Sequence, residues 1–364
     1  MTLPDLNQIS SWNYDLPESL IASRPAAQRD ASRLMVVRRD SGQIEHCSIA
    51  DLPHLLQPND RLVLNNTKVM PARLFGFRTQ TLGRWEGLFL QHHSENQWQI
   101  TGQTRGKLQA GESITLIPAS ESDKDLDQID RSLCSQQLQL VEKLPDGTWL
   151  VKLQPEGLTS EVLDEYGTLP LPPYIGRKVA DESDKDRYQT VYAKTAGAIA
   201  APTAGLHFTD ELLDECSTKG IHTTSVTLHV GIGTFRPVNA NQLSDHRMHS
   251  EWCEVTESAF TEIQTAKQAS GNIVCIGTTS VRTLEAAANE TTSQHWSGST
   301  DLFIRPGFEF QLVDQLLTNF HLPGSTLVVL VASLAGYELT MEAYRKAVEE
   351  KYRFYSYGDA MLIL

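Results

Sequence analysis

The sequence lacks the features that place a protein in a membrane or outside the cell. Its longest apolar run, 325–336, is shorter than the roughly 20 residues that span a bilayer. The N-terminal stretch MTLPDLNQISSW has no basic region and no apolar core, so we expect no signal peptide. The 5 cysteines are scattered and form no CxxC pair, which argues against a disulfide framework or a zinc ribbon. We therefore expect a reduced, cytoplasmic protein that has no membrane partner.

Positive charge is also scarce, since 31 Lys and Arg face 45 Asp and Glu and the net charge is −14. Phosphate binding needs clustered cations, so this balance argues against a general nucleic-acid binder. The charge is nevertheless uneven, because one N-terminal segment contains Arg24, Arg29, Arg33, Arg38 and Arg39. An acidic protein can present one basic face. The alternative is a solvated face with local ion pairs, and charge alone does not decide between them.

The 364 residues suffice for two domains, and their texture changes twice. From 73 to 155, short alternating segments recur between Gly, Asn and Asp turns, which is typical of a small antiparallel barrel. From 190 onward strands and helices alternate. We predict the α/β class: a larger mixed α/β, barrel-like domain (1–72 and 156–364) with an inserted small antiparallel β-barrel domain (73–155).

Hydrophobic periodicity predicts the individual elements. The acidic stretch 119–137 is expected to form an exposed hairpin tip or a partly disordered loop. A hairpin is expected at 32–49, with its turn at 40–42. Helices are expected at 17–23, 157–166, after Thr209, at 257–270, at 280–289, after Ser325 and at 340–354, and strands at 222–230, 272–277, 300–307 and 359–364.

Hydroxyl residues follow the strand predicted at 272–277. Thr278, Thr279 and Ser280 come directly before a helix, whose N-terminal N–H groups can bind an anion or a polar ligand. Arg282 and Glu285 lie three residues apart and share one face of that helix. The alternative is a capped helix with a surface ion pair.

Two loops combine a histidine with glycines. The strand TTSVTLHV leads to His229, Gly231 and Gly233, but Arg236 occupies the last glycine position of GxGxxG. This loop favours close backbone approach to a planar or sugar ligand rather than a dinucleotide fold. The stretch APTAGLHFT places His207 among small residues just before a helix, which indicates a ligand-holding loop or a tight turn.

Three further segments carry polar residues of interest. Asp301 and Arg305 bracket a predicted strand and would share a face. His321 precedes Pro-Gly and is either a site residue or a turn residue bonded to backbone. VLNNTKVMPARLFG has a dense polar knot that includes Lys68 and Arg73.

A metal site has weak support. His246, His249 and Cys253 have metal-binding chemistry, but the alternation of RMHSEWCEV sends His246 to the opposite face of a strand. We therefore expect no metal. The polar residues at strand ends together suit an enzyme that holds a polar, multi-part small molecule.

Eight blocks of the chain resemble one family, the S-adenosylmethionine:tRNA ribosyltransferase-isomerases of queuosine biosynthesis. They are YDLPESLIASRPAAQRDASRLMVV, VLNNTKVMPARLFG, APTAGLHFT, TLHVGIGTFRPV, HRMHSEWCEV, IGTTSVRTLEAAA, TDLFIRPGFEFQLVDQLLTNFHLPGSTLVVLVASLAG and YRFYSYGDAMLI. The resemblance spans nearly the whole chain in one order and is weakest at 120–137. It implies a larger α/β domain with an inserted small β-barrel.

The resemblance also implies an unusual reaction. The ribosyl part of S-adenosylmethionine is transferred to the aminomethyl group of 7-aminomethyl-7-deazaguanine at the tRNA wobble position and isomerised. The products are epoxyqueuosine-tRNA, adenine and methionine. S-adenosylmethionine is then a consumed co-substrate, and no metal or other cofactor is required. The expected partner is a tRNA with a GUN-type anticodon, and we expect a monomer.

This chemistry suggests roles for the residues singled out above. The sulfonium makes the C5′ protons acidic, so a general base is needed there, and the departing adenine needs a general acid. The methionine carboxylate suits Arg282 or the 278–280 helix start, and its ammonium suits Glu285 or Asp301. The catalytic candidates are His207, His229, His321, Arg282 and Glu285. The substrate-binding candidates are Thr203, Gly205, Gly231, Gly233, Thr278, Thr279, Ser280, Asp301 and Arg305. The tRNA-binding candidates are Arg24, Arg29, Arg33, Lys68 and Arg73.

Three other functions compete with this hypothesis. One is an S-adenosylmethionine-dependent RNA methyltransferase, although the glycine loop does not follow a first strand. Another is a metal hydrolase that uses His246, His249 and Cys253. The third is a non-catalytic RNA-binding module built on the barrel, although the polar strand ends lie outside it.

Overall fold

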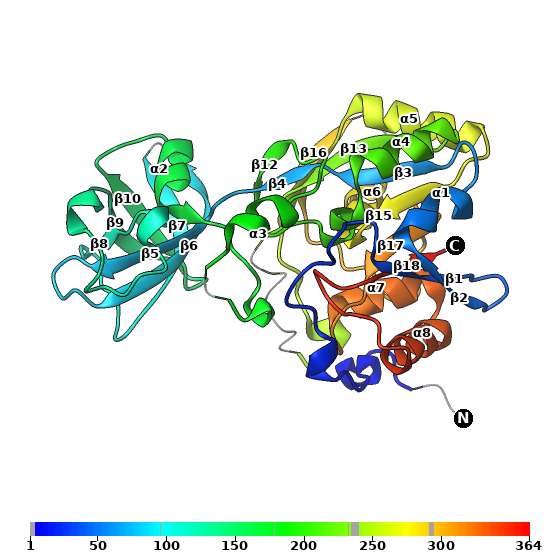
Figure 1. Ribbon diagram of the computed structural model, residues 1–364, viewed down its shortest axis with the longest axis horizontal. Coiled ribbons are helices and arrows are strands. Elements are labelled where there is room, and N and C mark those ends of the chain that lie inside the picture. Colours follow the sequence, from blue (N-terminus) through cyan, green and yellow to red (C-terminus); the bar gives the residue numbers. More distant parts are fainter. Residues whose placement is uncertain (1–3, 95, 178, 232, 234–239, 291–294) are drawn as a thin grey trace. The chain divides into compact units, whose positions relative to one another are not determined.

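The computed structural model describes residues 4–94, 96–177, 179–231, 233, 240–290 and 295–364. The chain divides into two compact units (Figure 1). The large unit consists of Met1–Lys68 and Arg187–Leu364, and the small unit is Val69–Asp186. The small unit is therefore an insertion in the chain of the large one.

A mixed sheet of nine described strands forms the centre of the large unit. Its order is β16 (Trp296–Thr300), β14 (Glu251–Val255), β13 (His222–Leu228), β3 (Arg61–Asn65), β15 (Ile273–Ile276), β17 (Gln315–Asn319), β18 (Ala360–Ile363), β1 (Arg33–Val37) and β2 (Ile44–Ser48). The neighbours β13, β3, β15 and β17 run parallel, and antiparallel strands flank them. Among the described strands no pairing joins β16 to β2, so the sheet is open and the predicted barrel-like closure is not formed.

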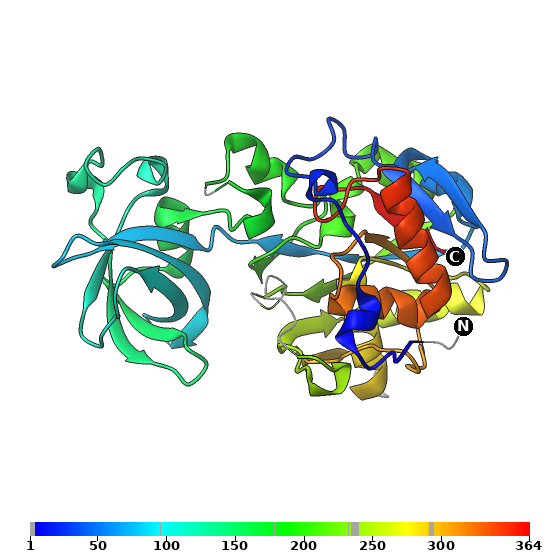
Figure 2. The same ribbon diagram turned by 90° about the horizontal axis from the view of Figure 1, so that it is seen from below.

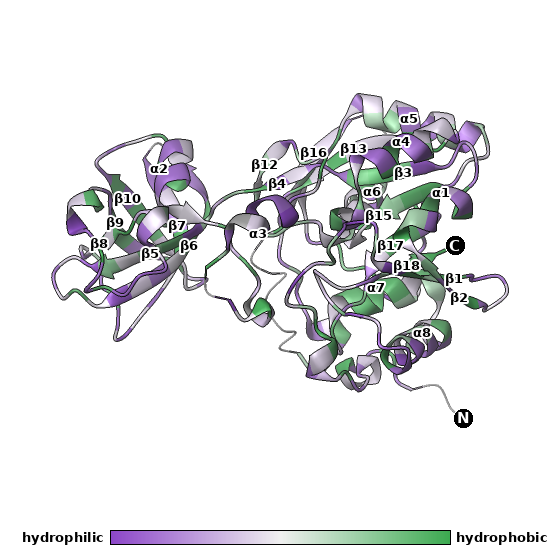
Figure 3. Ribbon diagram, in the orientation of Figure 1, coloured by the Kyte–Doolittle hydropathy of each residue, from purple (hydrophilic) through white to green (hydrophobic). Residues whose placement is uncertain are grey.

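Helices cover both faces of this sheet, because its central strands are hydrophobic on both sides. Val63 and Cys275 belong to one core, whereas Leu62 and Val274 belong to the other. The first core includes residues of α5 (Glu257–Gln268), α6 (Thr278–Glu290), α7 (Thr326–Ala335) and α8 (Tyr337–Glu349). The second includes residues of α1 (Leu52–Leu55) and α4 (Asp210–Thr218). Figure 2 shows α7 and α8 side by side, and Figure 3 shows hydrophobic residues along the central strands.

No single helix in the described ranges is long and apolar enough to cross a membrane. By length and composition alone the pair α7 and α8 would pass, with a bend of 119° between them. Val328 and Val331 of α7 are completely buried in the first core, as expected for an internal helix of a folded unit.

The small unit contains a closed antiparallel barrel, which confirms the inserted β-barrel of the predicted α/β fold. Its strands are β5 (Arg73–Arg78), β6 (Arg84–Ser94), β7 (Gln97–Thr104), β10 (Trp149–Gln154), β9 (Gln137–Lys143) and β8 (Ser113–Leu116), and β8 pairs back to β5. The unit extends beyond the predicted range 73–155, because α2 (Thr159–Tyr166) packs on the barrel. Leu163 and Tyr166 of α2 share a core with Trp98, and β11 (Gly167–Thr168) pairs with β5.

The acidic stretch 119–137 is folded rather than disordered in the described structure. It forms two short 3-10 helices, Ala119–Glu121 and Arg131–Leu133. Ile129 packs in a cluster with Phe75 and Phe77 of the barrel. Ile129, with Leu126 and Cys134 packed against the same cluster, thus anchors a loop whose polar composition suggested disorder.

Two other predicted elements differ from the structure. The helix predicted at 17–23 is only a 3-10 turn, Glu18–Leu20, because Ile21 leaves it to form a parallel bridge with Phe354. The strand predicted at 300–307 is not formed beyond its first residue. The observed strand, β16, ends at Thr300, opposite Glu251, because its partner β14 begins there. The other short elements are α3 (Glu182–Arg187), β4 (Thr67–Val69), β12 (Thr195–Ala198) and several 3-10 turns.

Candidate active site at the carboxyl edge of the large sheet

Polar residues gather where the four parallel strands end. The residues that follow β3, β13, β15 and β17 include Asn66, His229, Thr278 and His321. The carboxyl ends of parallel neighbours lie at one edge of a sheet, and open α/β sheets bind ligands outside that edge. We call this part of the large unit the carboxyl edge. It unites strand-end residues that the sequence presented separately.

The buried amide of Asn65 ties two of these strand ends together. Its Nδ2 donates to the Leu228 carbonyl over 3.0 Å, and its Oδ1 accepts from the Leu228 N–H at 3.0 Å. The same oxygen accepts from the Thr67 N–H at 3.2 Å. Both the nitrogen and the oxygen of this amide are therefore hydrogen-bonded to backbone groups, as a buried polar group requires. The polar knot of the sequence is therefore a clamp between β3 and β13.

His229 is held on three sides directly beyond this clamp. Its Nδ1 lies 2.8 Å from the Thr67 hydroxyl. One ring face stacks on Trp252 with 5.1 Å between centroids and 23° between planes. Gly197 lies against the ring, since an added Cβ there would come 2.5 Å from Nε2. The ring is half-buried, and desolvation lowers the pKa of His229.

The APTAGLHFT stretch forms a 3-10 turn, Thr203–His207, against the ends of β15 and β17. Ala204 packs beside Gly277, where an added Cβ would lie 3.5 Å from the Ala204 Cβ. A Cβ on Gly205 would overlap the Tyr192 hydroxyl. These small residues therefore allow the turn to pack closely against neighbouring segments of the large unit. Of the two alternatives for this stretch, a ligand-holding loop or a tight turn, this packing matches the tight turn.

His207 itself is buried and its ring is fixed by the Asn319 amide. Asn319 Nδ2 lies 3.1 Å from the Tyr355 carbonyl oxygen and 3.2 Å from His207 Nε2. A carbonyl only accepts, so the amide nitrogen faces both atoms and donates its second N–H to the Nε2 lone pair. Burial lowers the pKa of His207 to about 4, against the raising effects of the Asp359 charge and a hydrogen bond to the Arg29 main chain.

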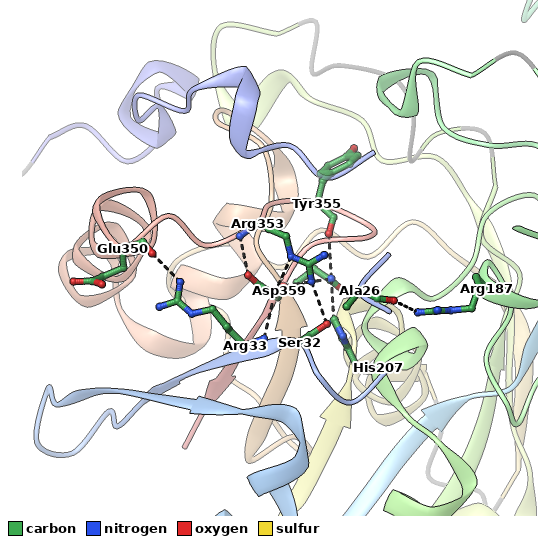
Figure 4. Close-up of polar contacts among 10 residues, drawn as sticks. Ala26, Ser32, Arg33, Arg187, His207, Glu350, Arg353, Tyr355 and Asp359 are labelled. Carbon is green, nitrogen blue, oxygen red and sulfur yellow. Dashed lines mark hydrogen bonds and ion pairs between the residues drawn. The ribbon is translucent and has the colours of Figure 1, made fainter. Parts of the chain in front are cut away.

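A small pocket opens beside His207, and Figure 4 shows polar contacts around it. Arg187 donates to the Ala26 carbonyl over 2.7 Å, and Arg29 donates to the Leu206 carbonyl over 3.0 Å. Arg29 thus joins the N-terminal segment to the 203–207 turn, and Arg187 joins the same segment to the end of α3. The lining residues are Pro25, Ala26, Arg29, Ser32, Arg187, Leu206, His207, Ser356, Tyr357 and Gly358.

The predicted tRNA-binding residues have different surroundings. Arg33 donates to the Glu350 carbonyl over 2.7 Å and lies 3.7 Å over the Tyr352 ring. Arg73 of the small unit pairs with Glu86 at 2.6 Å. The side chains of Arg24 and Lys68 are exposed, whereas Arg29 and Arg33 are half-buried. Part of the arginine cluster therefore serves internal contacts.

Arg282 and Glu285 do not interact as a pair, although they share one helix. Arg282 forms a buried ion pair with Glu251 and donates to the Leu302 carbonyl over 3.2 Å. Glu285 is completely buried and accepts from the N–H groups of Gln311, Leu312 and Val313 at 2.9, 3.0 and 2.9 Å. The alternative of a surface ion pair between Arg282 and Glu285 is therefore wrong. Arg282 binds the carboxylate of Glu251, and the Glu285 carboxylate binds backbone N–H groups.

The glycine loop after His229 is fixed by the same ion pair. Glu251 accepts the Gly231 N–H at 2.9 Å while it binds Arg282. Gly233 faces the His249 ring, since an added Cβ would lie 2.5 Å from it. Arg236 lies outside the described residues. At the start of α6, Ser280 donates to the Ile276 carbonyl over 2.9 Å.

The other candidates are spread over the large unit. Asp301 and Arg305 are exposed and lie in a segment without regular structure, so no strand gives them a shared face. His321 is buried and its Nε2 lies 2.9 Å from the Thr318 hydroxyl. Burial lowers the pKa of His321 to about 3. In the described ranges no group of three or more His, Cys, Asp or Glu is placed to hold a metal ion.

Three residues of the carboxyl edge were missed from the sequence. Asn319 and Trp252 carried no signal, because a lone amide or tryptophan in a strand is most often packing. Glu251 stands between the possible metal ligands His249 and Cys253 in the sequence. Its alternation with buried Cys253 and Val255 on β14 was the available hint that it faces the interior.

Comparison with known proteins decides the family of a chain with this site. A family model described as "Queuosine biosynthesis protein" matches residues 9–363. The chain belongs to this family. Proteins named S-adenosylmethionine:tRNA ribosyltransferase-isomerase from Symbiobacterium thermophilum and Staphylococcus epidermidis are 46% and 44% identical to it. These matches cover 98% of this chain and 100% and 99% of the relatives.

A solved structure also matches over nearly the whole chain. It is the crystal structure of S-adenosylmethionine tRNA ribosyltransferase from Thermotoga maritima, 35% identical, with a TM-score of 0.55. The match covers 98% of this chain and 100% of the other. The resemblance drawn from sequence blocks and the enzyme class it implied are therefore confirmed.

The buried pair of Glu251 and Arg282 should be important for stability. Glu251→Gln leaves the guanidinium buried without a counter-charge, so we expect a loss of about 3–5 kcal/mol in the free energy of unfolding. Urea denaturation measures this loss. Glu254→Gln is the matched control, because Glu254 lies on the other face of the same strand. Equal stability of the two variants would contradict the importance of the pair.

The buried histidines should make stability depend on pH. Folded His321 stays neutral down to about pH 3, whereas the unfolded residue protonates near its ordinary pKa of 6.5. The unfolded state therefore binds more protons between these values, and stability falls as the pH decreases through this window. The lowered pKa of His207 adds to the effect. His321→Gln should lose less unfolding free energy than the parent chain between about pH 7 and pH 5. Parallel curves for both proteins would refute this.

Proposed function

We propose that this chain transfers and isomerises the ribosyl moiety of S-adenosylmethionine onto the aminomethyl group of 7-aminomethyl-7-deazaguanine at the tRNA wobble position. The products are epoxyqueuosine-tRNA, adenine and methionine. One observation carries the proposal: the chain matches proteins named for this activity over 98% of its length and essentially all of theirs. The carboxyl edge of the large sheet supplies the groups that the chemistry needs.

We propose His229 as the general base for the acidic C5′ protons beside the sulfonium. The Thr67 hydroxyl is directed at the Thr195 carbonyl, 3.5 Å away, so its oxygen is free to accept from His229 Nδ1–H. The Nε2 lone pair is then available to take a proton. Desolvation lowers the pKa of His229, which keeps the ring in its basic, neutral form at neutral pH. Trp252 and Gly197 hold the ring in place, as catalytic positioning requires.

His207 and His321 suit hydrogen bonding better than proton transfer. Their pKa values, about 4 and about 3, keep both rings neutral near neutral pH. His207 accepts a hydrogen bond from Asn319, and the turn that carries it contacts Arg29. We propose that His207 forms a wall of the substrate site and aligns the 203–207 turn, with Thr203 and Gly205.

The methionine part of the substrate needs a site for its carboxylate. Arg282 is engaged by Glu251, and Glu285 is engaged by three backbone N–H groups. We propose the start of α6 at Thr278–Ser280 instead, because a helix N-terminus attracts anions. The Thr279 hydroxyl is buried and has no hydrogen-bond partner among the described residues, so it is available to a ligand.

The tRNA partner needs basic residues on an acidic protein. We propose that the exposed Arg24 and Lys68 contact the tRNA, with Arg29 and Arg33 holding their segment in shape. Arg73 has an ion-pair partner in Glu86, so its share in tRNA binding is expected to be smaller. A tRNA with a GUN-type anticodon and a monomeric enzyme complete the proposal.

A single-turnover assay tests the reaction and the role of His229 together. The chain is mixed with S-adenosylmethionine and tRNA that carries the aminomethyl-deazaguanine base, and the products are followed by mass spectrometry. We expect free adenine, free methionine and a ribosyl-derived mass gain on the nucleoside. His229→Gln should slow this turnover by about 10²–10⁴-fold, the usual loss for a general base.

His222→Gln is the control for this assay, because His222 is an exposed residue at the other end of β13. It should turn over at the parent rate. S-adenosylhomocysteine with a methyl gain on the tRNA would replace the proposal with the methyltransferase alternative. Full turnover by His229→Gln would remove His229 from the mechanism but not the reaction.

Charge reversal tests the proposed tRNA contacts. Arg24→Glu and Lys68→Glu should weaken tRNA binding and reduce the slope of log affinity against log salt by about 1 for each lost phosphate contact. Filter binding over a range of salt concentrations measures both effects. Arg345→Glu, on the exposed face of α8, should leave the slope unchanged. If all three variants bind alike, the tRNA face lies elsewhere, with the barrel as the next candidate.

A further inference from the structure

Trp252 is one of the few large hydrophobic side chains that the described part of the chain leaves open to solvent. It is 38% exposed, although its neighbours on β14, Glu251 and Cys253, are buried. An exposed tryptophan by itself is ordinary. This one lies at the carboxyl edge and stacks on the histidine that we propose as the base.

The position of Trp252 follows from strand register. The His229 N–H donates to the Trp252 carbonyl over 2.9 Å, so His229, directly after β13, lies across from Trp252 of β14. On the other side, Trp252 pairs with Ser299 of β16. Directly opposed residues project to the same face of a sheet. His229, Trp252 and Ser299 therefore form a row across three strands.

The two neighbours of Trp252 in this row are very different in size. His229 covers one side of the indole, with nearly parallel rings, and is itself backed by Gly197. Ser299 is small and exposed, and it lies on the outermost strand of the sheet next to Gly298 and Ser297. The indole is therefore rigidly supported on its histidine side and open on its serine side.

We propose that Trp252 is a stacking platform for the deazaguanine base that the tRNA presents for modification. The base would extend the stack formed by Gly197, His229 and Trp252, with the Ser299 hydroxyl near its edge. Stacking of a splayed-out base on an aromatic side chain is the usual way in which proteins hold single-stranded RNA bases. This inference rests on the proposed function, because it assigns the substrate base of that reaction to one side of the indole whose other side supports the proposed catalytic base.

The openness of the indole favours the tRNA base over the adenine of S-adenosylmethionine. Small-molecule sites enclose most of their ligand's surface. A wobble base must instead reach the site from a large polynucleotide, and an exposed platform at the outer strands of the sheet is accessible to it.

A double-mutant cycle between the side chain and the base tests the platform. Binding is measured without S-adenosylmethionine, for tRNA with the aminomethyl-deazaguanine base and for the same tRNA with an abasic wobble nucleotide. Trp252→Ala should weaken binding of the base-carrying tRNA by about 5- to 150-fold, the range found for loss of one base–aromatic stack. It should leave binding of the abasic tRNA unchanged, so that the cycle shows a coupling of the same size.

Three further variants make the result specific. Trp252→Phe retains an aromatic face and should retain most of the coupling. Ser299→Leu fills the open side of the indole and should lose it, although Trp252 is intact. Val191→Ala removes a hydrophobic side chain of similar exposure, 37%, in the same unit and should behave like the parent chain. In turnover assays Trp252→Ala should raise KM for the tRNA more than it lowers kcat.

The outcomes separate this inference from the proposed reaction. Zero coupling between Trp252 and the base would overturn the platform even if the parent chain makes epoxyqueuosine. Weaker binding of S-adenosylmethionine to Trp252→Ala, with unchanged tRNA binding, would also overturn it and assign the indole to adenine. Coupling to the base in a chain that releases no adenine would instead support the platform and refute the reaction.

Discussion

The buried amide of Asn65 is the interaction on which the arrangement of the carboxyl edge depends. It hydrogen-bonds both backbone groups of Leu228 and the N–H of Thr67 at the point where β3 and β13 end. An unpaired buried amide would be costly, so this geometry tolerates little movement. It places the Thr67 hydroxyl and His229 within hydrogen-bond distance. The proposed base is therefore positioned by the backbone of two adjacent strands rather than by a mobile loop.

Several charged side chains of the large unit point inward and bind other groups of the protein. Arg282 is buried with Glu251, and Asp359 binds both the Arg353 side chain and the Arg33 N–H. The Glu285 carboxylate accepts hydrogen bonds from three backbone N–H groups. Apart from the Arg353–Asp359 pair, these contacts join segments that are far apart in the sequence, so they fix loops at the edge of the sheet. An arginine count from the sequence therefore overestimates the positive charge that is available to a polyanion.

Much of the fold could be predicted because its signals are local. The apolar runs of β3, β15 and β18, the Thr209 and Ser325 N-caps and the alternation of the barrel strands are all patterns within short segments. The failures were non-local. The strand at 296–300 ends where its partner begins, and the acidic loop is ordered by Ile129 against residues of another strand. Neither partner can be recognised from the segment itself.

For the site, the sequence by itself determined which chemistry was present and where strands would deliver it. His229 after an apolar strand and the hydroxyls at the start of α6 follow from periodicity, and the blocks that resemble the family identify the reaction. Only the tertiary structure decided the partners. It pairs Arg282 with Glu251 rather than with Glu285. It also places His207 in hydrogen-bond contact with Asn319 and stacks Trp252 on His229. The physical reason is that hydrogen bonding, desolvation and stacking depend on which strands become neighbours, and that order is set by the packing of the whole unit.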